Sequence, residues 1–383
     1  MDRDNSAARL KADAESGDTV TSSVNEWIDG DAALASLCAA LADAPLVAID
    51  TEFVREKTYY PQLCLIQVAT REHAACIDCL APLDLAPLFE LLFRPDRTWV
   101  LHSARQDLEV IWLRASRVPP RLIDTQVGAA LVGWPPQLGL EALLERTLQV
   151  TLGESFARTD WSRRPLPPAA LHYALEDVRH LLPAWDVLER RLLELGRLDW
   201  LQEDCARTLA EPPVPDTTAV WARLKGVHGL PFAAQCAALE LVRWRERAAQ
   251  RSDRPRRWLL EDDKLLALAA ALPATPDQIA ELMPPKFVAR NAEEIVAAVA
   301  RRDAAEVQAS VRASAAQLAP DKTKVKALQE DARQRAAALG LEPEVLATKR
   351  DLAALAAGNP PAHLRAGWRA AALGLTPAAA GGV

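Results

Sequence analysis

The stretch LVAIDTEFV (46–54) decides the fold of this chain. Its apolar residues predict a buried strand, which bears two acids, Asp50 and Glu52, near its end. CLIQVAT (64–70) and AACID (74–78) predict two further strands, close enough along the chain to pair as a hairpin. This region therefore predicts the start of a β-sheet.

Helices and short strands alternate after this hairpin. Apolar residues at helical spacing predict a helix over 85–93 and an amphipathic helix over 104–115. Strands are predicted at 98–103 and 120–125, and almost only helices from residue 138 onward. Strands that are followed by strand–helix alternation predict an α/β domain with one mixed sheet flanked by helices.

The chain divides into several parts. We expect the α/β domain to occupy residues 25–210, because the proline cluster EPPVPD (211–216) has the composition of a linker. Only helical patterns follow, which predict two all-α modules at 216–295 and 305–375. Residues 1–24 are short of aromatic and β-branched residues and predict a disordered leader.

Composition excludes several classes of protein. Of the 383 residues, 50% are hydrophobic and 25% are charged, which is ordinary for a folded protein. No stretch approaches the roughly 18 uninterrupted apolar residues of a membrane span, and the polar N-terminus lacks the apolar centre of a secretory signal. The six cysteines are irregularly spaced and predict no disulfide framework. We therefore expect a cytoplasmic protein without a membrane partner; no protein partner can be deduced.

Charge is unevenly distributed along the chain. The formal net charge of −7 disfavours a nucleic-acid partner when it is taken over the whole sequence. Residues 1–205, however, hold 32 acids and 20 bases, whereas residues 206–383 hold 20 acids and 25 bases. An acidic front and a basic back indicate two tasks in one chain, and the basic half is compatible with RNA.

Four acids and a tyrosine are candidates for a metal site. Asp50 and Glu52 lie two residues apart on one strand, so they point to the same face, where burial is costly unless a cation compensates them. Asp107 lies early on the helix over 104–115, and Tyr173 precedes Asp177 by one helical turn. Oxygen ligands of this kind select hard divalent cations such as Mg²⁺ or Mn²⁺.

The order of these residues resembles the ribonuclease D family, in the branch of the DEDD superfamily of 3′→5′ exonucleases that has a tyrosine in its third motif. The three motifs are Asp50-Thr51-Glu52-Phe53, His102-Ser103-Ala104…Asp107 and Tyr173…Asp177. Segments typical of the family also occur at 58–67, 122–126 and 158–166. Residues 216–295 resemble the helicase-and-ribonuclease-D C-terminal (HRDC) module, and the last eighty residues resemble a more degenerate second copy.

The resemblance implies a ribonuclease H-like fold and hydrolysis of RNA from its 3′ end by two Mg²⁺ or Mn²⁺ ions. Asp50, Glu52 and Asp177 would hold the first ion, with Asp50 bridging to a second that Asp107 reaches directly or through water. Tyr173 would orient the attacking water and help to remove its proton. The products would be nucleoside 5′-monophosphates. The usual substrates of the family, tRNA precursors, suggest a role in maturing tRNA 3′ ends.

Further residues are candidates for contact with RNA. A basic and aromatic group near the third motif predicts stacking and phosphate pairing, although a loop with a packing tryptophan fits it equally well. The candidates at the active site are Phe53, His102, Arg158, Trp161 and Arg164. For His102 a hydrogen-bonded core position is the stronger interpretation. Asp124, in LIDTQ, is expected to cap the helix that follows it.

An arginine-rich stretch, VRWRERAAQRSDRPRRW (242–258), predicts sequence-neutral contact with the RNA backbone. A solvated helix and loop is the alternative. The anchoring candidates are Arg243, Arg247, Arg251, Arg254, Arg256 and Arg257.

Two other functions remain open at this point. A DNA-directed 3′→5′ exonuclease could use the same four acids, because no residue declares a contact to the 2′-hydroxyl. A non-catalytic scaffold that binds nucleic acid is disfavoured, since all four acids and Tyr173 are present.

Overall fold

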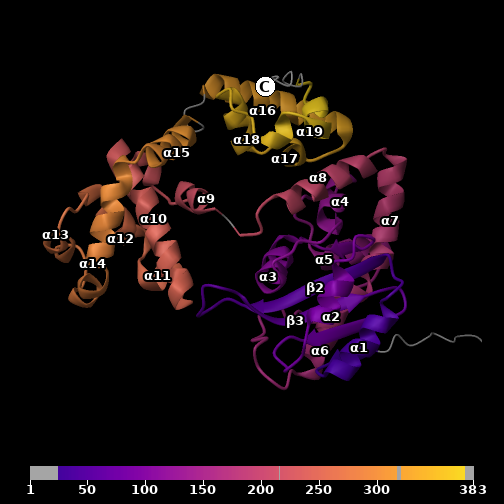
Figure 1. Ribbon diagram of the computed structural model, residues 1–383. Helices are drawn as coiled ribbons and strands as arrows, with labels where there is room; N and C mark the ends of the chain where they lie inside the picture. Colours follow the sequence, from indigo (N-terminus) through magenta and orange to yellow (C-terminus); the bar gives the residue numbers. More distant parts are fainter. Residues whose placement is uncertain (1–24, 215, 317–320, 376–383) are drawn as a thin grey trace, which may run out of the picture.

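The α/β domain is built around a six-stranded mixed sheet (Figure 1). The structure is a computed structural model that describes residues 25–214, 216–316 and 321–375; the predicted leader, 1–24, lies outside them. The spatial order of the strands is β1-β4-β3-β2-β5-β6. Their bounds are β1 (Asn25–Ile28), β2 (Leu46–Val54), β3 (Gln62–Ala69), β4 (Ala74–Asp78), β5 (Thr98–Leu101) and β6 (Leu122–Asp124).

Strand β2, the stretch quoted first, lies inside the sheet. It pairs antiparallel with β3 and parallel with β5, and the β3–β4 hairpin is antiparallel, so the predicted mixed sheet is confirmed. The β2–β3 register shifts between Glu52 and Phe53, an irregularity that redirects the side chains around it. No strand was predicted for β1, which pairs in parallel with β4 at the sheet edge.

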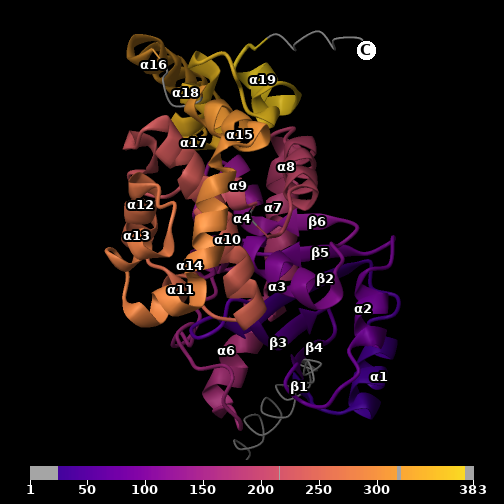
Figure 2. The ribbon, with the colours of Figure 1, turned by 60° about the vertical axis from the view of Figure 1, so that its left-hand side comes forward.

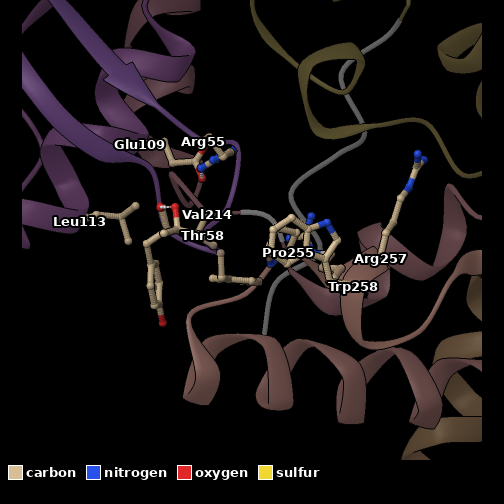
Figure 3. A pocket seen from close by; sticks show the side chains of 11 residues that line it. Arg55, Thr58, Glu109, Leu113, Val214, Pro255, Arg257 and Trp258 are labelled. Atoms are coloured by element: carbon tan, nitrogen blue, oxygen red, sulfur yellow. Dashed lines mark hydrogen bonds and ion pairs between the residues drawn. The ribbon is translucent and has the colours of Figure 1, made fainter. Parts of the chain in front are cut away.

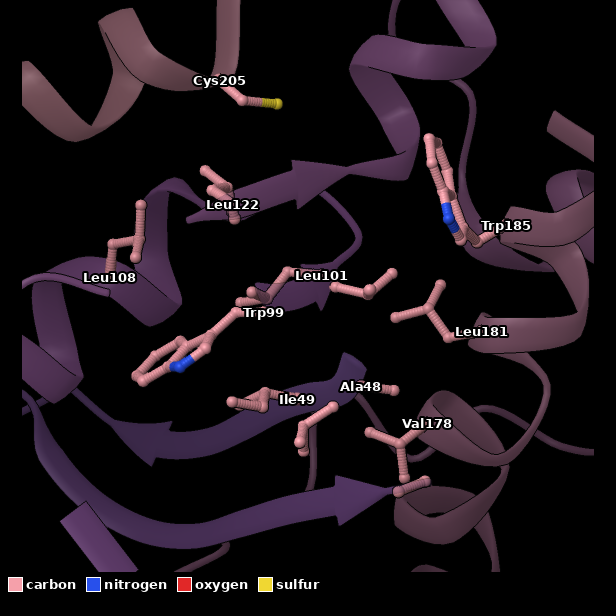
Figure 4. Packing of buried hydrophobic residues seen from close by; sticks show 14 of the residues in the cluster. Ala48, Ile49, Trp99, Leu101, Leu108, Leu122, Val178, Leu181, Trp185 and Cys205 are labelled. Carbon is pink, nitrogen blue, oxygen red and sulfur yellow. The ribbon is translucent and has the colours of Figure 1, made fainter. Parts of the chain in front are cut away.

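Helices cover the sheet and close its core (Figure 4). In Figure 4, Ala48 of β2 lies beside Val178 and Leu181, whereas Ile49 lies on the side of Trp99. Because side chains alternate along a strand, Asp50 shares the face of Ala48, which is the side of α6. The helices of this domain are α1 (Asp31–Ala40), α2 (Ala86–Leu92), α3 (Arg105–Ala115), α4 (Thr125–Leu131), α5 (Leu140–Leu148), α6 (Pro168–Arg179), α7 (Leu181–Glu194) and α8 (Leu198–Ala210).

The first helical module has α10 as its central helix. α10 packs against α9, α12, α14 and α15 around an apolar core that contains Trp221, Leu239 and Ile295. The α-helices are α9 (Thr217–Ala222), α10 (Phe232–Ser252), α11 (Arg256–Leu259), α12 (Asp262–Ala271), α13 (Pro276–Ala280), α14 (Pro285–Ala300) and α15 (Ala305–Ala316). Two short 3₁₀ helices, η1 (Val227–Gly229) and η2 (Arg301–Asp303), connect them.

Helix α15 packs differently from the predicted module boundaries. Val307 and Val311 are buried in the core of the first helical module, whereas the sequence assigned residues from 305 onward to the second. The prediction rested on helical sequence patterns alone, which do not show how a helix packs. We propose that the division between the modules lies after Ala316.

The second helical module shares its core with the α/β domain. It comprises α16 (Lys322–Leu339), α17 (Pro343–Leu346), α18 (Lys349–Ala356), η3 (Ala362–Leu364) and α19 (Gly367–Ala372). Figures 1 and 2 both show α19 beside α8. The rings of Trp200 and Trp368 stack with centroids 4.5 Å apart, and Arg369 Nη2 donates to Asp204 Oδ2 at 2.9 Å. This buried contact joins the second helical module to helix α8 of the α/β domain.

None of the helices in the described residues combines the length and the apolar character that crossing a membrane requires.

Candidate active site

Three acids from two elements converge on one point. Asp50 and Glu52 come from β2, and Asp177 comes from α6, which packs on β2, β3 and β4. One carboxylate oxygen of each lies within 4.8 Å of the others, a spacing at which three ligands can share a cation. The expectation that Asp50 and Glu52 point to the same face is thereby confirmed.

Asp107 joins the same pocket from helix α3. A pocket of about 670 Å³ is lined by Asp107 together with Asp50, Glu52 and Asp177. The hydroxyl of Thr51 donates a hydrogen bond to Asp107 Oδ1 at 2.5 Å. Thr51 therefore holds the helix acid against the strand that bears the other two.

Asp124 fixes the turn that leads into α3. Its carboxylate accepts hydrogen bonds from the backbone N–H groups of Gln126 (2.9 Å), Ser103 (3.0 Å) and Ala104 (3.0 Å). The first bond is the predicted helix cap, which is confirmed. The other two hold Ser103 in the left-handed region, with φ of 64°, immediately before the helix that bears Asp107.

Tyr173 lies one turn before Asp177 on α6. A hydrogen bond from its hydroxyl favours the charged form of Asp177 and lowers the pKa of that carboxyl, against the larger effect of burial. Burial raises the pKa of the Tyr173 phenol itself, and the charges of Asp177, Glu52 and Asp50 raise it further. The phenol is therefore protonated at neutral pH and suited to donate a hydrogen bond.

The electrostatics of this pocket call for a cation. Burial, together with repulsion from neighbouring cluster acids, raises the pKa of Asp50 to about 7 and of Glu52 to about 9. Burial and the charge of Glu176 raise the pKa of Asp177 to about 7. Burial and the charge of Asp50 also raise the pKa of Asp107 well above its usual range. No lysine or arginine is among the main groups that shift these four pKa values in the described chain. Hard oxygen ligands without a cationic partner fit a divalent metal ion.

The predicted substrate contacts have separate outcomes. Phe53 lines the pocket, and Arg158 is exposed beside Ala157, which also lines it; their contact with RNA stays a prediction. His102 also lines the pocket, but its ring nitrogens lie 2.9 Å from Thr125 Oγ1 and 2.9 Å from the carbonyl oxygen of Leu138. Both nitrogens are thus engaged within the fold, which favours the core interpretation of His102.

Two predicted contacts are unsuited to bind substrate. Trp161 is only 1% exposed and packs beneath Tyr173, with ring centroids 6.4 Å apart, so no base can stack on it. Arg164 pairs with Asp78 at 2.6 and 2.7 Å and donates to backbone carbonyls, which occupies its guanidinium. The basic and aromatic residues at 158–166 therefore serve mainly to hold the fold together. This agrees with the alternative interpretation of the segment as a loop with a packing tryptophan.

The arginine-rich stretch is also only partly available. Arg243 pairs with Glu240 at 2.7 Å, and Arg256 pairs with the buried Glu246 at 2.5 Å, so these two predicted anchors serve the fold. Four others have exposed side chains, and their contact with RNA stays a prediction: Arg247, Arg251, Arg254 and Arg257.

Sequence reasoning missed several residues of the pocket. Arg105 and Gln106 line it from the first turn of α3. Arg105 also donates to Glu211 Oε2 at 3.1 Å and to the carbonyl oxygen of Pro212 at 2.9 Å, which ties the linker to the pocket rim. Their position immediately before Asp107 was the available signal.

Comparison with known proteins agrees with this geometry. Residues 25–193 match the family model described as 3′-5′ exonuclease, and residues 237–299 match the HRDC domain. The chain is 40% identical over 276 residues to a Ribonuclease D of Nitrobacter hamburgensis, covering 70% of this chain and 72% of the relative. It is 36% identical over 353 residues to a Ribonuclease D of Granulibacter bethesdensis, covering 88% and 87% of the two chains.

A solved structure extends the similarity to most of the fold. The crystal structure of Escherichia coli RNase D, described as an exoribonuclease involved in structured RNA processing, matches with a TM-score of 0.78 and 29% identity. The match covers 91% of this chain and 97% of that one.

The mixed sheet, its acidic pocket and the matched domain define a 3′→5′ exonuclease. More particularly, the chain belongs to the ribonuclease D family and is an exoribonuclease, followed by helices that include an HRDC domain. The predicted family, fold class and enzyme class are thereby confirmed.

Proposed function

We propose that this exoribonuclease trims the 3′ ends of tRNA precursors and releases nucleoside 5′-monophosphates. The observation that supports the proposal most is the cluster of Asp50, Glu52 and Asp177, whose ligand oxygens lie within 4.8 Å of one another. Such a cluster suits phosphodiester chemistry only when cations reverse its negative charge.

We assign the metal ligands from this cluster. Asp50, Glu52 and Asp177 would hold one Mg²⁺ or Mn²⁺ ion, and Asp107, with Asp50, would hold a second. Two ions in such a site would lower the pKa of the attacking water and stabilise the leaving 3′ oxygen.

The protein's own groups position the reactants. Tyr173 would orient the attacking water through its hydroxyl, because its raised pKa keeps the phenol protonated. The hydroxyl of Thr51 would hold the Asp107 carboxylate in position through its hydrogen bond. Asp124 would hold the start of α3 in place through the backbone N–H of Ala104. Phe53, at the wall of the pocket, would contact the terminal nucleotide.

A relative supports the proposed substrate class. The E. coli enzyme is described as acting in structured RNA processing, and a tRNA precursor with a 3′ extension is a structured RNA with a single-stranded end. We therefore expect trimming to stop where the extension meets the folded body. The cytoplasmic location stays a prediction, with which six free thiols agree.

One experiment tests substrate and metal together. Single-stranded RNA, single-stranded DNA and a tRNA with a 3′ extension are digested side by side with Mg²⁺, with Mn²⁺ and with a chelator. We expect mononucleotides from both RNAs, a discrete trimmed tRNA, and no product when the chelator is present. Faster digestion of DNA would favour a DNA-directed exonuclease, and trimming without any divalent ion would overturn the metal assignment.

A further inference from the structure

A second pocket lies where the α/β domain meets the first helical module. It has a volume of about 340 Å³. Figure 3 shows that its walls come from both parts of the chain: Arg55, Thr58, Glu109 and Leu113 on one side, and Pro255, Arg257 and Trp258 on the other. We name it the tryptophan pocket.

A specific contact between the two parts builds this pocket. The loop that joins β2 to β3 reaches α10, where the carboxylate of Asp253 accepts the backbone N–H groups of Tyr59 (3.0 Å) and Tyr60 (3.1 Å). The hydroxyl of Tyr59 donates to Glu246 Oε2 at 2.8 Å, and the guanidinium of Arg256 lies 5.2 Å from its ring centroid. Charged groups are thus arranged to hold the loop against the helices.

The lining is suited to a nucleotide. Trp258 is 63% exposed, the largest exposed fraction among the large hydrophobic side chains of the described residues, and Tyr60 is 38% exposed. Beside Trp258, Arg257 is 81% exposed and approaches Asp262 only to 3.8 Å, so its guanidinium is available to a phosphate. An accessible aromatic face next to an exposed cation is the combination that binds single-stranded nucleic acid.

The end of strand β2 and helix α3 contribute residues to both the tryptophan pocket and the active site. At the end of β2, Phe53 lines the acidic pocket and Arg55, two residues later, lines the tryptophan pocket. Along α3, Asp107 lines the first and Glu109 and Leu113 line the second. With a rise of about 1.5 Å per helical residue, the two pockets lie close together along α3.

We infer that the tryptophan pocket binds an upstream nucleotide of the RNA whose 3′ end is in the active site. The base stacks on Trp258, and Arg257 pairs with an adjacent phosphate. This inference rests on the proposed function, since it requires a single-stranded 3′ end as ligand. It assigns to the HRDC domain and the β2–β3 loop a joint site that neither forms alone.

A binding experiment without metal tests the pocket independently of catalysis. Single-stranded RNA decamers with one 2-aminopurine, moved stepwise from the 3′ end, are titrated with the full chain in the presence of a chelator. For the unaltered chain we expect the largest fluorescence change from stacking at one upstream position. Trp258→Ala should abolish that change and weaken binding about tenfold, as the loss of one stacked base does.

Two further variants sharpen the result. Arg257→Ala should weaken binding and lower the salt dependence of the affinity by about one counterion. Phe232→Ala is the matched control, because it removes another exposed aromatic ring, at the first residue of α10. This variant should bind like the unaltered chain. Unchanged affinity in Trp258→Ala, or an equal loss in Phe232→Ala, would overturn the inference.

Hydrolysis separates this inference from the proposed function. With Mn²⁺ present, the rise in KM caused by Trp258→Ala should be larger for a decamer than for a dinucleotide. An equal rise at both lengths would place the effect in the active site and count against a separate pocket. If the unaltered chain released no nucleotide, the proposed function would fail, while the metal-free titration would still decide whether the tryptophan pocket binds RNA.

Discussion

Individual carboxyl groups make the stability of the metal-free enzyme depend on pH. The pKa of Asp50 is raised to about 7 and that of Glu52 to about 9, so the folded chain retains protons that the unfolded chain has released. Unfolding then releases protons, and the free energy of unfolding falls as the pH rises from about 4 towards about 9. Urea denaturation at several pH values in a chelator should show this decline, and Mn²⁺ should reverse it. A metal-free stability that rises with pH over this range would contradict the prediction.

Asp107→Asn separates activity from stability. The substitution removes one metal-site charge, so we expect RNA hydrolysis to fall by at least about 10²–10³-fold. It also removes a buried charge that repels Asp50, so the metal-free variant should be at least as stable as the unaltered chain at pH 8. Both effects can be measured on one preparation, by mononucleotide release and by urea denaturation. Hydrolysis at the unaltered rate would refute the role of Asp107.

Thr51 offers a matched pair of substitutions. Thr51→Val keeps the shape of the side chain but removes the hydroxyl that donates to Asp107, whereas Thr51→Ser keeps the hydroxyl. We expect the valine variant to require more Mn²⁺ for half-maximal hydrolysis, because the Asp107 carboxylate loses the bond that favours its charged form. The serine variant should stay close to the unaltered chain. Equal metal requirements in both variants would exclude this positioning role.

At the residue scale the sequence predicted the acids better than their surroundings. Asp50, Glu52 and Asp177 follow from a short spacing along one strand or one helix, which fixes the face on which a side chain lies. The bond from Thr51 to Asp107 joins residues far apart in sequence, and no periodicity encodes it. Trp161 and Arg164 resembled an RNA-binding pattern because burial cannot be inferred from a loop sequence.

Among the elements, the β2–β3 loop and the end of α10 depend on each other. Asp253 ends α10 with φ of 44°, a conformation that glycine and asparagine tolerate. Asp253→Gly should therefore remove the acceptor of the Tyr59 and Tyr60 amides without backbone strain, while Asp253→Asn keeps one oxygen. We expect those two amides to exchange hydrogen at least about tenfold faster in the glycine variant, as the loss of about 1.4 kcal/mol would produce. Equal exchange in both variants would show that the carboxylate does not hold the loop.

Most elements of the sheet were predictable, and the exceptions have physical reasons. β2 to β5 are apolar runs bounded by turns, which is the strongest strand signal. β1 begins with the polar residues Asn25 and Glu26, so no apolar run marks it, and its pairing partner β4 lies far along the chain. The sequence assigned residues from 305 onward to the second helical module, and only tertiary contacts assign helix α15 to the first.

On the scale of the whole molecule, the second helical module is part of the nuclease core. Trp368 stacks on Trp200 of α8, and loss of a packed tryptophan costs about 3–5 kcal/mol. Deleting residues 321–383 should therefore lower the melting temperature of the nuclease by roughly 6 °C or more, at about 2–4 °C per kcal/mol. Removal of residues 376–383 alone, which spares Trp368, is the control. An unchanged melting temperature after the longer deletion would show that the modules are energetically independent.

Because of this packing, removal of the C-terminal helices also disturbs the core of the nuclease. A truncation after residue 215 removes the HRDC domain and part of the nuclease core together, so a loss of activity would not report on RNA binding. Substitutions on α11, such as Trp258→Ala, leave the shared core intact. The sequence predicted two modules that follow the α/β domain one after the other, because amino-acid composition marks the linkers between them. Composition does not show the long-range packing of the second helical module on the α/β domain.

The ion pair between Asp204 and Arg369 has a consequence for the order of synthesis. The two residues are 165 positions apart. At about 5–20 residues per second, a ribosome needs roughly 8–33 s after adding Asp204 to synthesise the chain as far as Arg369. During that interval the nascent nuclease has its sheet and its acids, while the buried carboxylate of Asp204 has Arg207 as an ion-pair partner but still lacks Arg369. The enzyme is therefore expected to reach its mature packing only after the segment that bears Arg369 has left the ribosome.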